Sequence, residues 1–144
     1  MTTQELSPQV HEAIQRFCAD GDNLASAGKF KDAIRAYNRA WAIVPEPKNE
    51  WNASTWILGA IGDSAFLSGY NTSAREALEY AMTCPEAVGN PFLHLRLGQV
   101  LLNIEEHDRA ADELMRAYMA GGEEVFASED TRYLSFLRTR AALD

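Results

Sequence analysis

The sequence of 144 residues predicts an all-α protein in which three helical hairpins are followed by a capping helix, about seven helices in total. The first observation behind this prediction is a glycine in the leading helix of each hairpin: Gly21, Gly62 and Gly98. The second is an alanine in each following helix: Ala33, Ala74 and Ala110. Both series are spaced by 41 and then 36 residues (62 minus 21, then 98 minus 62). Two independent markers keep one register, which indicates an internal repeat.

The first hairpin shows the pattern most completely. Its leading helix is predicted from about residue 8 to residue 27, because Ser7 can cap the free amides and Pro8 fits the first helical position. Gly28 ends this helix. The second helix follows, with three residues on one face and a proline stop after it: Ala33, Tyr37, Ala40 and Pro45. Small residues around one large residue favour two closely packed helices.

A polar connector with one large aromatic residue joins the first hairpin to the second. Asn52, Ser54 or Thr55 could cap the next helix. Trp51 either folds back on the repeat or stands exposed as a contact residue, and the sequence leaves both interpretations open.

The later elements have similar start signals. Asn90 and Pro91 open the leading helix of the third hairpin, and Ser128 or Asp130 begins the last helix. In that last helix, the residues expected to point inward are Tyr133, Leu134 and Leu137, and those expected to point outward are Arg132, Arg138 and Arg140. A terminal helix with one polar face is what a repeat array needs at its open end.

Residues 14–124 resemble the tetratricopeptide repeat (TPR) family. The pattern is a large residue, then glycine, then alanine followed by a large residue, then proline, here Phe17, Gly21, Ala33, Tyr37 and Pro45. The copies cover approximately 14–47, 55–88 and 91–124, with a capping helix at approximately 129–143, in a single domain spanning 1–144. Ala65 and His94 depart from the pattern. The resemblance implies a right-handed superhelical α-solenoid.

Composition excludes several classes of function. The chain carries 13 Lys and Arg residues against 21 Asp and Glu residues, a net charge of −8. This argues against nucleic acid and anionic lipid as partners, since both need basic surface. It suits a partner with basic surface, or it simply keeps the protein soluble. No apolar run is long enough for a membrane span, and no secretory signal is visible, so we expect a cytoplasmic location.

No pattern of catalytic residues is present. The sequence has no Gly-rich phosphate loop, no G-x-S-x-G, no C-x-x-C and no H-E-x-x-H. His11, His94 and His107 lie on different elements without metal-ligand spacing, and a packed or hydrogen-bonded role is expected for His94. Cys18 and Cys84 are expected to be small buried or half-buried residues. We therefore expect no catalytic residues, no cofactor, no metal and no enzyme activity.

The resemblance implies that a partner binds the concave face formed by the leading helices. The residues on these helices that point away from the helix packing are Gln15, Asp22, Trp56, Asp63, Phe66, Phe92, Arg96, Gln99 and Asn103. Aromatic residues and arginine often dominate interfaces, so the aromatic members would be anchors and the charged members would orient the partner. Trp56 and Phe92 could instead be core residues between repeats.

The sequence therefore predicts a non-catalytic interaction module that binds one protein or peptide in its groove. Two narrower roles fit its size and acidity: an immunity protein that neutralises a cognate toxin, and a chaperone for secreted proteins. An alternative of another class is a self-assembling structural protein, so the chain is expected to be a monomer or a homodimer.

Overall fold

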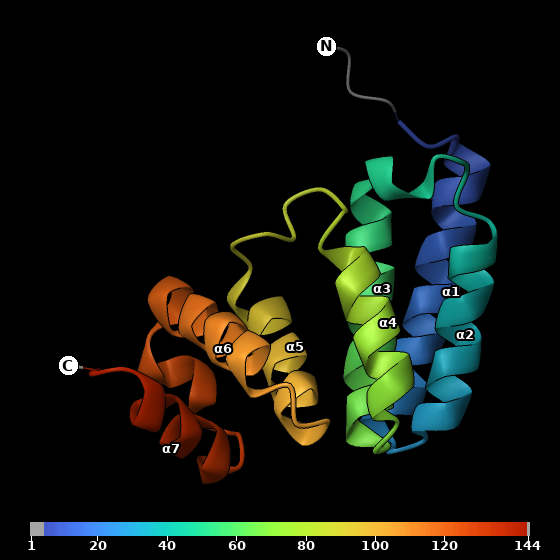
Figure 1. Cartoon of the computed structure of the whole chain (residues 1–144). Helices are drawn as coiled ribbons and strands as arrows, with labels where there is room; N and C mark the ends of the chain where they lie inside the picture. The colour runs from blue at the N-terminus through green and yellow to red at the C-terminus, as the bar shows by residue number, and fades with distance from the viewer. Residues whose placement is uncertain (1–4, 144) are drawn as a thin grey trace. The chain divides into compact units, whose positions relative to one another are not determined.

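The computed structural model describes residues 5–143, and its regular elements are helices (Figure 1). They are α1 (Pro8–Ser26), α2 (Phe30–Ala42), α3 (Asn52–Leu67), α4 (Asn71–Ala81), α5 (Pro91–Asn103), α6 (His107–Gly121) and α7 (Thr131–Arg140). Two short 3-10 helices, η1 (Lys48–Glu50) and η2 (Glu123–Phe126), precede α3 and α7. The predicted all-α fold is confirmed.

The chain forms two compact units, the first ending at Pro85 and the second beginning at Glu86. The first unit holds the hairpins α1–α2 and α3–α4, and the second holds the hairpin α5–α6 with η2 and α7. The expected single domain of 1–144 stays a prediction, and its end residues 1–4 and 144 lie outside the described part. No helix between residues 5 and 143 is long and apolar enough to cross a bilayer.

Each hairpin is closed by a contact between a glycine and a large side chain. A Cβ atom on Gly21 would lie 2.5 Å from Cε1 of Tyr37. A Cβ atom on Gly62 would lie 2.6 Å from Cγ of Leu78, and one on Gly98 would lie 2.7 Å from Cδ2 of Leu114. Carbon atoms normally meet at about 3.5–4.0 Å, so only glycine permits the helices to approach this closely.

The alanines of the repeat lie around these contacts. In the second helices of the three hairpins, six alanines have no exposed surface: Ala33, Ala40, Ala74, Ala81, Ala110 and Ala117. Their methyl groups pack where a larger side chain would separate the helices. The small and large residues of the repeat therefore act together to set the distance between paired helices.

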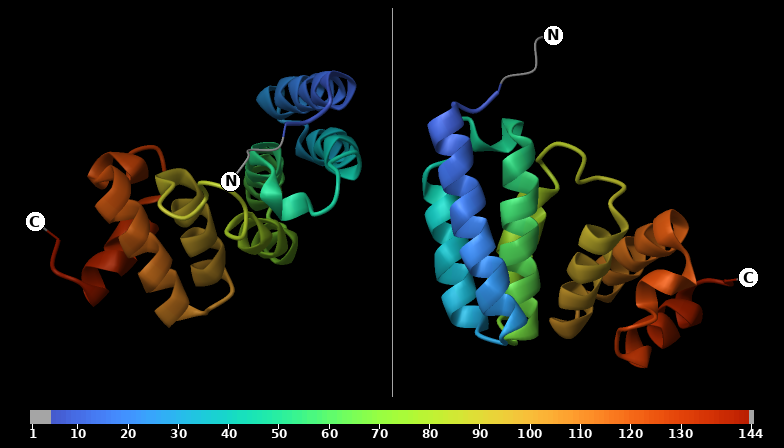
Figure 2. Two further views of the ribbon diagram at one scale, coloured as in Figure 1. Left: turned by 90° about the horizontal axis from the view of Figure 1, so that it is seen from above. Right: turned by 180° about the vertical axis from the view of Figure 1, so that it is seen from behind.

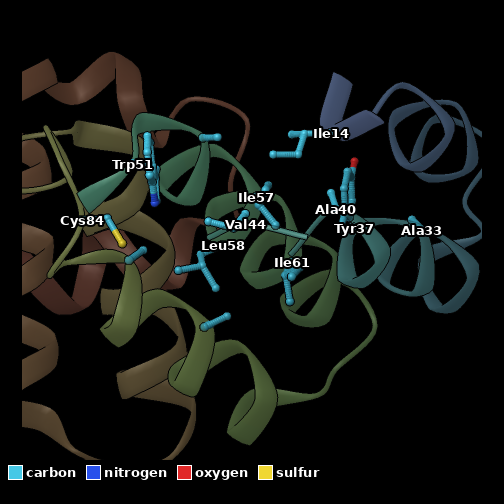
Figure 3. Packing of buried hydrophobic residues seen from close by; sticks show 13 residues of the cluster. Ile14, Ala33, Tyr37, Ala40, Val44, Trp51, Ile57, Leu58, Ile61 and Cys84 are labelled. Atoms are coloured by element: carbon cyan, nitrogen blue, oxygen red, sulfur yellow. The ribbon is translucent and has the colours of Figure 1, made fainter. Parts of the chain in front are cut away.

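The connector between the first two hairpins packs into the core of the first unit (Figure 3). Trp51 is buried in the same cluster as Val44 and Ile57, and its indole N–H donates to the carbonyl oxygen of Pro45 at 2.8 Å. The Ser54 hydroxyl donates to the carbonyl oxygen of Lys48 at 2.5 Å. Of the two interpretations of Trp51, the structure shows the folded-back one.

Most of the predicted helix starts are confirmed. The side chain of Ser7 accepts from the Val10 amide, and that of Asn90 accepts from the Leu93 amide. Asp130, rather than Ser128, caps α7. The expected cap of α3 is wrong, because its N-cap residue is Trp51 and makes no side-chain cap bond. The hydroxyl of Thr55 instead donates to the carbonyl oxygen of Pro85 at 2.7 Å.

We predict that Gly62→Ala lowers the free energy of unfolding by about 1–3 kcal/mol, because the new methyl group overlaps Leu78. Leu78→Ala alone is expected to cost about 2–5 kcal/mol through the cavity that it leaves. In the double variant the new methyl group has space, so the loss of stability should be clearly smaller than the sum of the losses in the two single variants. Urea unfolding of the four proteins measures this. A stabilising Gly62→Ala, as helix propensity alone would give, contradicts the packing argument.

Candidate functional site

In the first unit, the leading helices of the two hairpins lie on one face. Figure 2 shows α1 and α3 on the near side in its right-hand view, whereas α2 and α4 face the viewer in Figure 1. The predicted groove residues of this unit lie on α1 and α3: Gln15, Asp22, Trp56, Asp63 and Phe66. Gln15, Asp22 and Trp56 are exposed, and Asp63 and Phe66 are half-buried.

Trp56 is the most prominent of these residues, because 59% of its surface is exposed. Its direction is fixed by its neighbours on α3, since Ala53 and Ile57 are buried in the core of the unit. α3 is preceded by Trp51, whose indole is held by Pro45. The local sequence thus buries one tryptophan and, five residues later, exposes another (56 minus 51).

A hollow of about 470 Å³ lies beside Trp56, at the beginning of α1 and α3. On the side of α1 it is lined by Glu5, Leu6, Pro8 and His11. On the side of α3 its main lining residues are Trp51, Ala53 and Trp56. The hollow is therefore mostly apolar, with a carboxylate and an imidazole at its edge. An open apolar hollow beside an exposed aromatic ring is typical of a surface that receives a side chain of a partner.

Farther along α1, three polar groups interact. The Tyr37 hydroxyl donates to Oδ1 of Asp22 at 2.6 Å. Burial raises the pKa of the Tyr37 hydroxyl, and this hydrogen bond raises it further. Burial, followed by the charge of Asp22, raises the pKa of the half-buried Cys18 thiol to about 11. Asp22 therefore holds the tyrosine of the first hairpin in place, and its charge adds to the effect of burial on the pKa of the neighbouring Cys18 thiol.

Two of the predicted groove residues of the third hairpin, Arg96 and Gln99, are buried, and this corrects the prediction for these two residues. Arg96 is 7% exposed and Gln99 is not exposed at all. Nη1 of Arg96 donates to Oε1 of Gln99 at 2.7 Å and to Oε1 of Glu129 at 2.5 Å. Nε2 of Gln99 also donates to Oε1 of Glu129, at 2.8 Å. These two side chains hold the segment before α7 against α5, so they are not an accessible surface for a partner.

The other two predicted residues of α5 also have partners within the second unit. Oδ1 of Asn103 accepts from the Tyr133 hydroxyl at 3.0 Å and from the guanidinium of Arg132. The ring of Phe92 is 40% exposed, and the guanidinium carbon of Arg96 lies 5.1 Å from its centre. Asn103 thus contributes to the docking of α7, and Phe92 remains partly accessible.

His94 is a packed and hydrogen-bonded residue, as expected. It is 3% exposed, and its Nε2 accepts from the Gly89 amide at 2.8 Å. Because Nε2 is an acceptor, Nδ1 carries the proton and donates to Oε2 of Glu113 at 2.6 Å. His94 therefore ties the start of α5 to α6. Within residues 5–143, no group of three or more potential metal ligands comes together.

We predict that Glu129→Ala destabilises the protein by about 3 kcal/mol, because it removes the carboxylate that accepts from the buried guanidinium of Arg96. Glu124→Ala is the matched control, since it removes an exposed carboxylate from the same segment. Urea unfolding followed by circular dichroism compares the two variants. Equal stability of both variants would show that the network does not hold α7.

We predict that Cys18 reacts slowly with iodoacetamide at pH 8. A thiol whose pKa is about 11 instead of 9.0 holds about a hundredfold less thiolate, because two pKa units separate the values. Asp22→Asn should lower this pKa and increase the rate, while its amide oxygen can still accept from Tyr37. The rate is measured from pH 7 to 11 in a Cys84→Ala background. An unchanged pH profile in Asp22→Asn would exclude the carboxylate as a cause.

Comparison with known proteins gives similarities of structure only. The sequence matches no protein-family model and no curated protein. The structure is similar to the type III secretion chaperone SycD of Yersinia enterocolitica, solved in complex with a peptide of the translocator YopD. The two are 17% identical, with a TM-score of 0.69 over 94% of this chain and 95% of that chain.

Two TPR domains of other proteins are also similar. The first TPR domain of human RPAP3 is 13% identical, with a TM-score of 0.67 over 88% of each chain. The TPR domain of Sgt2 from Aspergillus fumigatus is 17% identical, with a TM-score of 0.66 over 96% of this chain and 86% of that chain. Together with the helical hairpins and their glycine contacts, these similarities show that the chain has the tetratricopeptide repeat fold.

Proposed function

We propose that this protein is a non-catalytic interaction module that binds one protein or peptide partner. The binding surface is the face of α1 and α3 in the first unit, with Trp56 as its anchor. The observation that carries the proposal is the exposed indole of Trp56 beside a mostly apolar hollow of about 470 Å³. Large aromatic side chains at the edge of a pocket contribute much of the binding energy in protein interfaces.

The position of this surface supports the proposal. Both helices that form it are held by buried contacts on their other sides: Ile14 of α1 and Ile57 of α3 belong to one core cluster. The surface is therefore preformed, and a partner need not order it at a cost in free energy. Gln15 and Asp22 of α1, with Asp63 and Phe66 of α3, extend the surface away from the hollow. Arg96, Gln99 and Asn103 are left out, because they bind the segment that includes Glu129 and α7.

A secretion-type chaperone is the narrower candidate. Its support is the likeness to the chaperone SycD, which extends over nearly the whole of both chains. SycD was solved with a peptide of the translocator YopD. The immunity role has no comparable support. The alternative of another class is a self-assembling structural protein. Light scattering on the purified protein distinguishes the two functions, because a monomeric protein would exclude self-assembly.

The test is a selection from a phage-displayed library of random dodecapeptides on three immobilised proteins. They are the native chain, Trp56→Ala and Met119→Ala. Met119 is the matched control, because its side chain is 79% exposed and it belongs to α6, which is not one of the helices of the proposed surface. We expect the native chain and Met119→Ala to enrich the same peptides, and Trp56→Ala to bind those peptides at least tenfold more weakly, about 1.4 kcal/mol or more.

Other outcomes would contradict the proposal. If all three proteins bind the same peptides equally, the binding surface lies elsewhere on the molecule. If no peptide is enriched on the native chain, the protein is not a peptide-binding module. Circular dichroism of Trp56→Ala must match that of the native chain, which is expected because the indole contributes little to the core.

A further inference from the structure

The hollow beside Trp56 combines an aromatic face, apolar walls and one negative charge. Its apolar walls come from Leu6, Pro8 and Ala53, with the two tryptophans. Among the residues between 5 and 143 that line it, Glu5 is the only acid, and none is Lys or Arg. The neighbouring helix surface adds no cation from α3, whose only charged residue is Asp63.

We propose that this hollow receives a cationic side chain of the protein partner, an arginine or a lysine. The cation lies over the indole of Trp56 and pairs with the carboxylate of Glu5, and its aliphatic stem packs along Leu6 and Pro8. This inference rests on the proposed function and adds the chemistry of the occupant to it.

Charge is the first argument for a cation over a purely apolar side chain. An apolar occupant would take the Glu5 carboxylate out of water without giving it a partner, which is costly. A guanidinium or ammonium group replaces the lost water with an ion pair. The net charge of −8 also favours encounter with a basic partner.

The second argument is that several other aromatic rings of this chain have a Lys or Arg side chain close to the ring face. A cation of the chain's own lies within 6 Å of several ring centres, namely those of Trp41, Tyr70, Phe92, Tyr133 and Phe136. Nζ of Lys48, for example, is 4.7 Å from the ring centre of Trp41. Within residues 5–143, none of these ring–cation contacts involves Trp56. Trp has the strongest attraction for cations among the aromatic residues, so its exposed face is suited to a cation from outside.

The test uses the dodecapeptides selected by the native chain. Each is synthesised twice, once with its arginines and once with citrulline, which has nearly the same shape without the charge. Affinities are measured by fluorescence polarisation for the native chain, Glu5→Gln, Glu12→Gln and Trp56→Leu. Glu12→Gln is the matched control, because Glu12 is an exposed acid of α1 that does not line the hollow.

We expect arginine or lysine in the selected peptides and a loss of about threefold to tenfold on citrulline substitution. This loss should shrink in Glu5→Gln and in Trp56→Leu and stay unchanged in Glu12→Gln. Peptides that depend on Trp56 but lack a cation, or that tolerate citrulline, overturn the inference and leave the proposed function standing. A citrulline loss that is equal in the native chain and Glu5→Gln also overturns it. Binding that does not depend on Trp56 overturns both.

Discussion

The close contact between a glycine of one helix and a large side chain of the next is the constraint on which each hairpin depends. The two members are sixteen residues apart in every pair (37 minus 21, 78 minus 62, 114 minus 98). A Cβ at the glycine overlaps the large side chain, and a smaller side chain opposite the glycine leaves a cavity, so a change of either residue alone destabilises the hairpin. The distance between the paired helices of each hairpin follows from this contact.

The fold was predictable because its signals are local and repeated. Glycines, alanines and helix starts such as Ser7 and Asn90 each depend on residues within a few helical turns, so the sequence shows them directly. The sequence left Trp56 open between the groove and the core between repeats. The structure shows it exposed, because Ala53 and Ile57 take the buried positions of α3. The role of Trp51 could not be chosen from the sequence, because it depends on the path of the connector back to Pro45.

The part of the candidate site on α5 was not predictable in this way. Arg96 and Gln99 have the helical position of groove residues, but a single carboxylate, Glu129, lies 30 or more residues later and binds both. Such a contact depends on where the segment before α7 packs against α5. The periodicity of residues within α5 does not reveal that position. The sequence did contain one chemical signal. The side chains of Arg96 and Gln99 need a hydrogen-bond acceptor if they are buried, and the acidic residue Glu129 lies just before the last helix.

The three tryptophans occupy three different environments: Trp51 is buried, Trp41 is half-buried, and Trp56 is largely open to water. Their fluorescence therefore has separable contributions, with the emission at longest wavelength and most accessible to soluble quenchers coming from Trp56. A molecule that settles beside Trp56 would change this contribution directly and that of Trp41 least. The protein thus has a built-in optical reporter at the surface where we place its partner, and no label has to be attached there.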